Sequence, residues 1–279
     1  MYHAIAVRDW AHLSEIARFL QGWAFRGQED AALSLSTSFE RRASRCGWTP
    51  AERKQKEEQI LEHFQRRAHH YLVSCPERDD WLEWLALIQH HGGSTRLLDF
   101  SRSAYVGAFF AVEDAVQDAA LWCVNLDMLH RRVVEALEIR DSGKVTIKSP
   151  RERSAAVANM VLKQQLTKKT GRVLPVEPFR LSERMSIQQG LFLMPVVLRK
   201  SFERNLIETY GLEPDVFAEA ADLDVDIMSE KELAVLKVII PLVARNEIVS
   251  ELAKMNITAS TLFPGVDGFA RSLNNHFVE

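Results

Sequence analysis

The clearest change of secondary structure in the chain falls in one stretch, Gln89-His90-His91-Gly92-Gly93-Ser94-Thr95-Arg96-Leu97-Leu98-Asp99. Its two consecutive glycines end a helical pattern, because glycine stops helices and favours turns. The four residues Thr95 to Leu98 then predict a short strand that delivers Asp99 to its end. Ser103 is placed to cap a further helix, whose small residues allow close packing. Helix, strand and helix in close succession indicate a mixed architecture.

Apolar spacing and capping residues predict the other helices. Thr49 and Pro50 are typical of a helix start, with Glu52 placed to bond back to the cap, and this helix should run to about Tyr71. The predicted helices begin near residues 10, 49, 79, 103 and 149, and the last runs to about Thr167.

Short strands are predicted between these helices. They cover residues 23–25, 95–98, 121–126, 173–179, 191–198 and 236–240. Their spacing does not follow regular βαβ units, which favours an α+β fold over a doubly wound sheet. No segment has the composition of a linker, so we expect one mixed domain over residues 1–279.

Composition and charge exclude several classes of protein. The 279 residues carry a formal net charge of −3, so global attraction to nucleic acid or anionic lipid is not expected. The longest apolar run, residues 233–244, is well short of the roughly 20 residues that span a bilayer. The cysteines, Cys46, Cys75 and Cys123, offer no CxxC spacing and no disulfide framework. With no signal peptide recognisable at residues 1–10, these features lead us to expect a cytoplasmic protein without a membrane partner.

Familiar catalytic and metal-binding motifs are absent. The sequence has no GxxxxGK[ST], GxGxxG, HExxH or GxSxG motif. The histidine pairs 69–70 and 90–91 would point about 100° apart on a helix, so neither pair readily ligates one ion. His63 and His70 share a helix face, but no third ligand is apparent from the spacing. We therefore expect no metal site.

Three segments carry recognisable motifs. They are Trp23–Gln28 (WAFRGQ), Gln89–Asp99 and Thr261–Gly268 (TLFPGVDG). The first contains Phe25-Arg26-Gly27, which matches the Phe/Tyr-Arg-Gly motif that names the FRG-domain family. The second resembles that family's Gln-His-Tyr-Gly-x-Pro-Thr-Arg-Leu-Leu-Asp-Trp block, with three replacements: His91, Ser94 and Phe100. The resemblance extends over residues 23–273, and it implies a role in bacterial antiviral defence or in a toxin locus.

The order of these motifs also resembles, more weakly, that of ADP-ribosyltransferases. This second resemblance implies an ADP-ribosyltransferase-like version of the α+β fold, with NAD consumed as a substrate. Arg26 would then grip the pyrophosphate of NAD through its bidentate fork, which lysine could not reproduce. Thr95 would orient the nicotinamide ribose.

A carboxylate should stabilise the oxocarbenium-like centre that forms when nicotinamide leaves. DNA-modifying transferases carry a glutamate shortly after a glutamine on a late strand, where this chain has Gln189 and Gly190. The other candidate is the Glu-x-Glu of arginine-directed transferases, here Glu230 and Glu232.

The predicted site combines these segments. His90 has a side chain suited to acid–base work near neutral pH, with a reference pKa of about 6.5. The predicted catalytic residues are Arg26, His90, Thr95 and Gln189. The predicted NAD-binding residues are Phe25, Arg26, Gly27, Gln89, Arg96 and Asp99. A purely structural interpretation remains open, in which Arg26 and Arg96 form buried ion pairs with Asp99.

Two other functions also remain open. A nucleic-acid-binding or nucleic-acid-cleaving defence module would hold phosphates through Arg26, Arg96 and the cluster Arg41, Arg42 and Arg45 without using NAD. A phage-sensing interaction domain would need neither ligand. The resemblance implies a nucleic-acid or protein acceptor as one partner and an antitoxin or phage protein as another.

Overall fold

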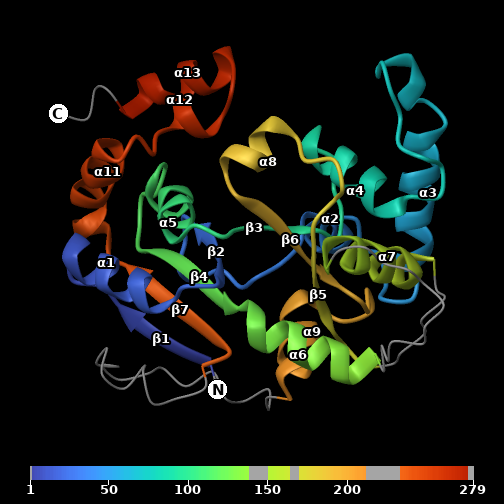
Figure 1. Cartoon of the computed structure of the whole chain (residues 1–279), viewed down its shortest axis with the longest axis horizontal. Coiled ribbons are helices and arrows are strands. Elements are labelled where there is room, and N and C mark those ends of the chain that lie inside the picture. Colours follow the sequence, from blue (N-terminus) through green and yellow to red (C-terminus); the bar gives the residue numbers. More distant parts are fainter. Residues whose placement is uncertain (1, 138–149, 164–169, 212–232, 276–279) are drawn as a thin grey trace.

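The computed structural model describes residues 2–137, 150–163, 170–211 and 233–275 (Figure 1). Its described strands form one sheet with the order β1-β7-β4-β2-β3-β6-β5. The strands are β1 (Tyr2–Ala6), β2 (Trp23–Gln28), β3 (Leu98–Ser101), β4 (Ala119–Asn125), β5 (Val173–Val176), β6 (Gly190–Pro195) and β7 (Val235–Ile240). Only β1 and β7 are parallel; every other neighbouring pair is antiparallel.

Helices surround this sheet. In chain order they are α1 (Trp10–Phe19), α2 (Ser38–Arg45), α3 (Arg53–Gln65), α4 (Trp81–His90), α5 (Ala104–Val112), α6 (Leu126–Leu137), α7 (Pro150–Leu162), α8 (Glu183–Ile187), α9 (Phe202–Tyr210), α11 (Arg245–Lys254), α12 (Ala259–Leu262) and α13 (Val266–Ser272). The combination of one mixed sheet and helices outside regular βαβ units confirms the expected α+β fold. No helix among these described segments is long and apolar enough to cross a membrane.

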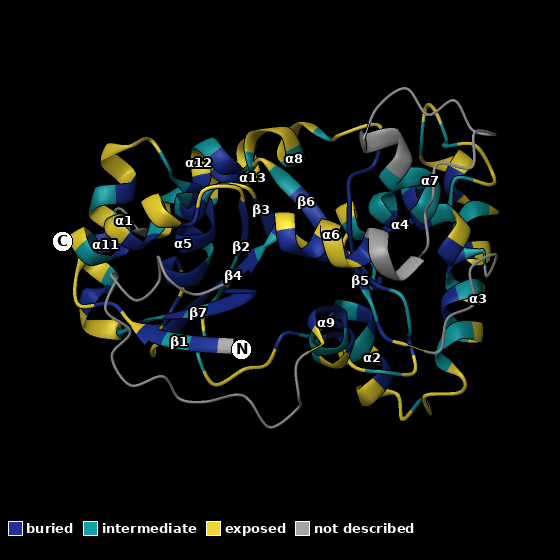
Figure 2. Ribbon diagram, turned by 60° about the horizontal axis from the view of Figure 1, so that its bottom comes forward, coloured by how far each residue is buried: buried dark blue, intermediate teal, exposed yellow. Residues whose placement is uncertain are grey.

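The two faces of the sheet bury different cores. On one face, α1, α5 and α11 cover β1, β7, β4 and β2, whereas α3, α4 and α7 cover β6 and β5. These two apolar clusters remain separate. On the opposite face, a single cluster with α6 and α9 runs underneath β4, β2, β3 and β6. Figure 2 shows that the central strands are buried while helices such as α8 and α13 are largely exposed.

Strand register shows where the gap lies between the two apolar clusters that share one face of the sheet. Side chains alternate between faces along a strand, and cross-strand partners share a face. Phe25 pairs with Ser101, and Asp99 pairs with Phe192, so all four side chains belong to the face with two separate clusters. Figure 1 shows β3 running between α5 and α4, with α8 above it. The gap between the two clusters therefore lies over β2 and β3.

Most elements predicted from the sequence are present, with shifted ends. Ser103 caps α5, and Asp80 caps α4. The predicted strand at residues 95–98 is wrong: β3 begins at Leu98, so Asp99 lies inside the strand. The cause is that Thr95 bonds to α2 instead of to a strand, accepting the backbone N–H of Phe39 at 3.0 Å.

The helix expected at Thr49 also begins later, at Arg53. Glu52 accepts hydrogen bonds from the backbone N–H and the hydroxyl of Thr49, at 2.8 and 2.7 Å. These bonds close a turn ahead of the helix, so the expected cap does not lie on the first helical turn. The end expected for α7 near Thr167 lies outside the described residues.

Several elements have no local signal in the sequence. The edge strand β1 pairs with β7 across more than two hundred residues of chain, and short polar helices such as α2 and α8 lack a long apolar stripe. Tertiary contacts rather than local propensity therefore stabilise these elements.

Candidate functional site

A cleft of about 640 Å³ lies over the gap between the two apolar clusters. Its floor is formed by Phe25 and Gly27 of β2 and by Asp99 and Ser101 of β3, together with Phe192 of β6. One wall is α5, which contributes Phe110. The facing wall is α4, and α8 with the segment before it forms the rim; these contribute Ala86, Leu87, Gln89, His90, Pro178, Arg180, Leu181, Ser182, Arg184, Met185 and Gln188.

The cleft opens where the sheet splits. The described ladder between β2 and β3 contains one pair, Phe25 with Ser101, and the strands then separate. Beyond that pair, Arg26 donates from Nη1 to the backbone carbonyl of Asp99 at 2.9 Å. A guanidinium therefore joins two strands whose own backbone ladder has ended, and it does so at the edge of the cleft.

The glycine of the Phe25-Arg26-Gly27 motif allows close contact with α5. A Cβ added at Gly27 would lie 2.2 Å from the backbone nitrogen of Ala111 and 2.3 Å from the backbone oxygen of Gly107. Gly107 itself faces Phe25, whose Cβ would lie 2.8 Å from an added Cβ. Such separations leave no room for a side chain on either residue. The motif therefore serves the packing of α5 on β2 as well as the cleft.

We expect Gly27→Ala to lower the free energy of unfolding by about 3 kcal/mol, because the added methyl group would push α5 away from β2. Urea denaturation of the variant and the wild type would measure the difference. Gly190→Ala is the matched control, since its added Cβ would meet only ordinary contacts of 3.4–3.5 Å with Met185. Equal stability of the Gly27 and Gly190 variants would contradict the close-packing explanation.

The Arg26 guanidinium is buried, and only some of its hydrogen-bond donors have a partner. Burial lowers its pKa from the ordinary arginine value, while Asp99 opposes that effect and Arg41 adds to it. Its Nε is buried without a hydrogen-bond partner among the described residues. Buried polar groups are normally paired, so an unused donor on a residue that lines a cleft is available to an external acceptor. The expected ion pair with Asp99 is replaced by a bond to the backbone carbonyl of that residue.

A hydrogen-bonded chain instead holds the carboxylate of Asp99. Gln89 on α4 donates from Nε2 to Oδ2 of Asp99 at 2.8 Å, and Gln89 Oε1 accepts the hydroxyl proton of Thr95. Thr95 is 0% exposed and is tied to α2 through Ser38, whose hydroxyl accepts its backbone N–H at 3.0 Å. The threonine expected to touch a ribose therefore lies behind the cleft and orients Gln89.

Arg96 lies outside the cleft. It is 1% exposed, and its Nε donates to Oε1 of Glu57 at 2.6 Å while Nη2 donates to Oε2. The bidentate partner comes from α3, so the expected pairing of Arg96 with Asp99 is wrong. The carboxylate of Asp99 points into the cleft instead, whereas Arg96 lies beneath α3 and reaches the carbonyls of residues 195 and 196. Arg96 thus joins α3 to the end of β6.

Of the remaining predicted residues, one lines the cleft and one does not. His90 lines the cleft, and burial, His91 and Arg184 lower its pKa, which favours a neutral imidazole near pH 7. Gln189 is exposed, has a φ of 48° and does not line the cleft. Its neighbour Gln188 does, and donates to the carbonyl of Leu262 at 2.9 Å. The late strand expected at Gln189 and Gly190 begins only at Gly190, because Ser182 caps the short helix α8 ahead of it.

Three carboxylates line the cleft: Asp99, Glu29 and Glu83. Burial raises the pKa of Glu83, which accepts the backbone N–H of Arg180 at 2.9 Å. Asp99 differs from Glu83 in that a side-chain amide holds it beside an arginine. The glutamates 230 and 232 of the Glu-x-Glu pattern lie outside the described residues. Within the described part of the chain, no group of three or more potential ligands could hold a metal ion.

Arg184 and Phe263 were not predicted. Arg184 lines the cleft from α8, and the centre of its guanidinium lies 4.6 Å from the ring centroid of Phe263. Phe263 belongs to the motif segment Thr261–Gly268. The relevant signal was the Phe-Pro-Gly sequence between α12 and α13, but nothing local indicated which arginine would contact it.

The protein therefore has an α+β fold, and arginines line a cleft where two of its central strands separate. Comparison with protein families is consistent with the quoted motifs: the FRG domain model matches residues 21–120. This part of the chain, from the residues just before β2 to the start of β4, therefore carries an FRG domain. It contains Arg26, Gln89 and Asp99, whereas Arg184 and Phe263 lie beyond the matched residues. No curated protein and no solved structure gives a significant match to the chain.

Proposed function

We propose that the cleft binds NAD as a substrate and breaks its nicotinamide N-glycosidic bond in an ADP-ribosyltransferase-like reaction. The observation that carries this proposal is the joint placement of two groups. Arg26 has an unused buried donor beside the cleft, and the carboxylate of Asp99 is held in the same cleft by Gln89. An anion-binding fork next to an oriented carboxylate is the pair that such a reaction requires.

Each group has a distinct role. Arg26 binds the pyrophosphate through Nε and Nη2, while its Nη1 remains on the carbonyl of Asp99. The carboxylate of Asp99 faces the ribose carbon and stabilises the positive charge that develops there. Gln89 keeps this carboxylate in position, and Thr95 keeps Gln89 in position. Phe25, Phe110 and Phe192 provide apolar surface for the rings of the substrate.

The reaction balances without a metal or an oxidant. The bond between ribose C1′ and the pyridinium nitrogen breaks, and its electron pair neutralises the pyridinium as nicotinamide leaves. A nucleophile of the acceptor, or water, then bonds to C1′ and loses its proton. His90, which lies at the cleft and whose pKa is lowered, is suited to accept that proton. The acceptor would be a nucleic acid or a protein, as part of a defence or toxin system.

The direct test is the release of nicotinamide. The purified protein would be incubated with NAD alone and then with DNA, RNA or cell lysate, and free nicotinamide would be measured by mass spectrometry. Release that is lost when Arg26 or Asp99 is replaced would support the proposal, and the most effective addition would indicate the acceptor. No release under any of these conditions would reject it in favour of a nucleic-acid-binding or sensing role.

Asp99→Asn should lower the rate of nicotinamide release by about 10²–10³-fold, because the neutral amide cannot offset the charge on the ribose. The same variant should change stability by less than about 1 kcal/mol, since the asparagine oxygen can still accept from Gln89 and the side chain is exposed. Rates and thermal denaturation would be measured together. Asp127→Asn, on α6 away from the cleft, is the control, and a full rate in Asp99→Asn would remove this carboxylate from the mechanism.

A further inference from the structure

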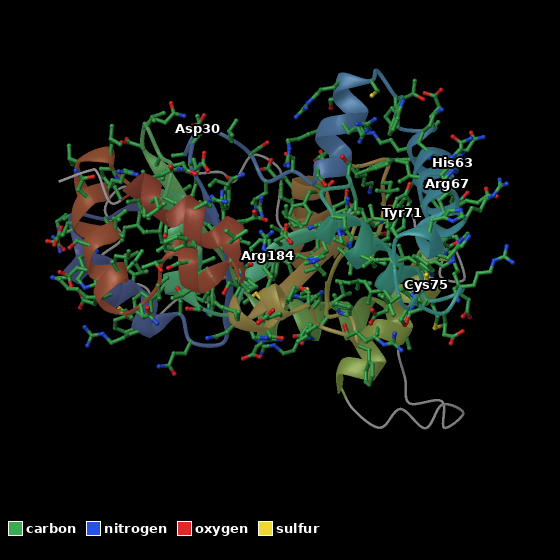
Figure 3. All side chains as sticks on the ribbon, turned by 90° about the horizontal axis from the view of Figure 1, so that it is seen from above. Asp30, His63, Arg67, Tyr71, Cys75 and Arg184 are labelled. Carbon is green, nitrogen blue, oxygen red and sulfur yellow. The ribbon has the colours of Figure 1, made fainter. Side chains whose placement is uncertain are left out.

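Arg184 is a cleft-lining arginine whose donors are unused. It lies on α8, while Arg26 lies on β2 at the edge of the cleft. Its guanidinium makes no hydrogen bond or ion pair with any residue in the described part of the chain. In Figure 3, Arg184 lies near the middle of the molecule beside the C-terminal helices. An arginine held at a cleft without a partner retains all five donors for an external group.

Phe263 determines where this arginine lies. Two guanidinium groups contact its ring, with the Arg184 centre at 4.6 Å and the Arg271 centre at 4.7 Å from the ring centroid. Phe110 of the cleft wall meets the same ring edge-on, at a centroid distance of 5.9 Å. Cation–π contacts of this kind orient a guanidinium without consuming its hydrogen-bond donors.

The second arginine, Arg271, is anchored by an ion pair. Arg271 donates two hydrogen bonds of 2.6 Å to the carboxylate of Glu113, which follows α5. Gly268 in α13 packs so closely that an added Cβ would lie 1.9 Å from the backbone oxygen of Phe263. The Phe263 ring is thus supported by α13 and by the end of α5. Arg184 depends on this ring, whereas Arg271 has its own ion pair.

We propose that Arg184 and Arg26 form a two-arginine clamp for a diphosphate group, and that Phe263 positions Arg184 for this binding. The clamp rests on the proposed function, because the pyrophosphate of NAD is the reason for choosing a diphosphate as its ligand. Both arginines line the cleft that also contains Asp99, and Arg26 donates to the backbone carbonyl of that residue at 2.9 Å. One carboxylate neutralises one of two guanidinium charges, and a diphosphate offers an acceptor group to each arm.

The clamp is tested by measuring the binding of ADP, AMP and adenosine with isothermal titration calorimetry. Of these three ligands, only ADP carries a diphosphate group for the two arginines. Arg184→Ala should weaken ADP binding by about 10- to 100-fold, because bidentate guanidinium–phosphate contacts are strong. The same change should weaken AMP binding less than ADP binding, and it should leave adenosine binding unchanged. Arg18→Ala on the exposed side of α1 is the matched control and should bind ADP normally. Unchanged ADP affinity in Arg184→Ala, or no ADP binding by the wild type, would overturn the clamp.

Replacing Phe263 tests the positioning role. Phe263→Leu should weaken ADP binding in the wild-type background but have no further effect when Arg184 is already alanine, because the ring acts through that arginine. Phe263→Tyr keeps an aromatic face and should restore the affinity. An equal loss in both backgrounds would show a general packing effect and would reject positioning by Phe263.

These binding tests do not require turnover, so they can fail separately from the proposed reaction. ADP binding that depends on Arg26 and Arg184, without nicotinamide release from NAD, would reject the reaction and support the clamp. Nicotinamide release with an unchanged KM for NAD in Arg184→Ala would support the reaction and overturn the clamp.

Discussion

Glu57→Ala is expected to lower the free energy of unfolding by about 3–5 kcal/mol, a large fraction of the stability of an ordinary domain. The reason is that Glu57 neutralises Arg96 where neither side chain reaches solvent, with exposed fractions of 4% and 1%. Without the carboxylate, the Arg96 guanidinium would remain charged and buried, and its acceptors among the described residues would be only the carbonyls of residues 195 and 196. Urea denaturation followed by circular dichroism would measure the loss.

Two comparisons make this prediction specific. Glu62→Ala, on an exposed position of the same helix, should change stability by less than about 0.5 kcal/mol. Replacing both partners, by Arg96→Met with Glu57→Leu, should lose much less than the single change, because no unpaired charge is then buried. A Glu57→Ala variant as stable as the wild type would mean that water reaches Arg96 and that the pair is not structural.

Arg26→Lys is expected to lower kcat/KM for NAD consumption by at least about a hundredfold while leaving the protein folded. Lysine keeps the positive charge but has no planar fork, so it cannot hold the carbonyl of Asp99 and a phosphate at the same time. Loss of an interaction made to a charged, desolvated group accounts for an effect of this size. The measurement is nicotinamide release as a function of NAD concentration.

Two further measurements distinguish a loss of binding from a loss of folding. The melting temperature of Arg26→Lys should stay close to that of the wild type, and ADP binding should fall together with kcat/KM. Arg18→Lys on α1 is the matched control and should behave as the wild type. Full activity in Arg26→Lys would show that charge alone is sufficient at this position, and it would remove the bidentate role from the mechanism.

The two arginines of the FRG-domain motifs could not be told apart from the sequence. Arg26 and Arg96 each follow an apolar residue or a threonine in a short strand-like segment, and each was a candidate partner for Asp99. The structure gives them different environments: Arg96 meets Glu57 from α3, whereas Arg26 meets a backbone carbonyl at the split in the sheet. A partner supplied by a helix about forty residues earlier leaves no local signal.

Six of the nine residues predicted for the site do line the cleft. They are Phe25, Arg26, Gly27, Gln89, His90 and Asp99. Their grouping was predictable because the two motifs that contain them match a known domain. Thr95 and Arg96 were expected at the same site because they belong to the second motif, but the backbone turns away from the cleft there to bond with α2. Gln189 was wrongly placed at the cleft because a short helix precedes β6, and Gln188 faces the cleft instead.

The sequence alone determined the features that depend on neighbouring residues. Apolar spacing and the capping residue Ser103 located helices, and the Phe25–Gly27 motif indicated the FRG domain. Tertiary structure decided the features that depend on distant partners: the split between β2 and β3, the buried pair of Arg96, and the stacking of Arg184 on Phe263. The physical reason is that capping and periodicity act within a few residues, whereas strand register and ion pairing join segments brought together only by folding.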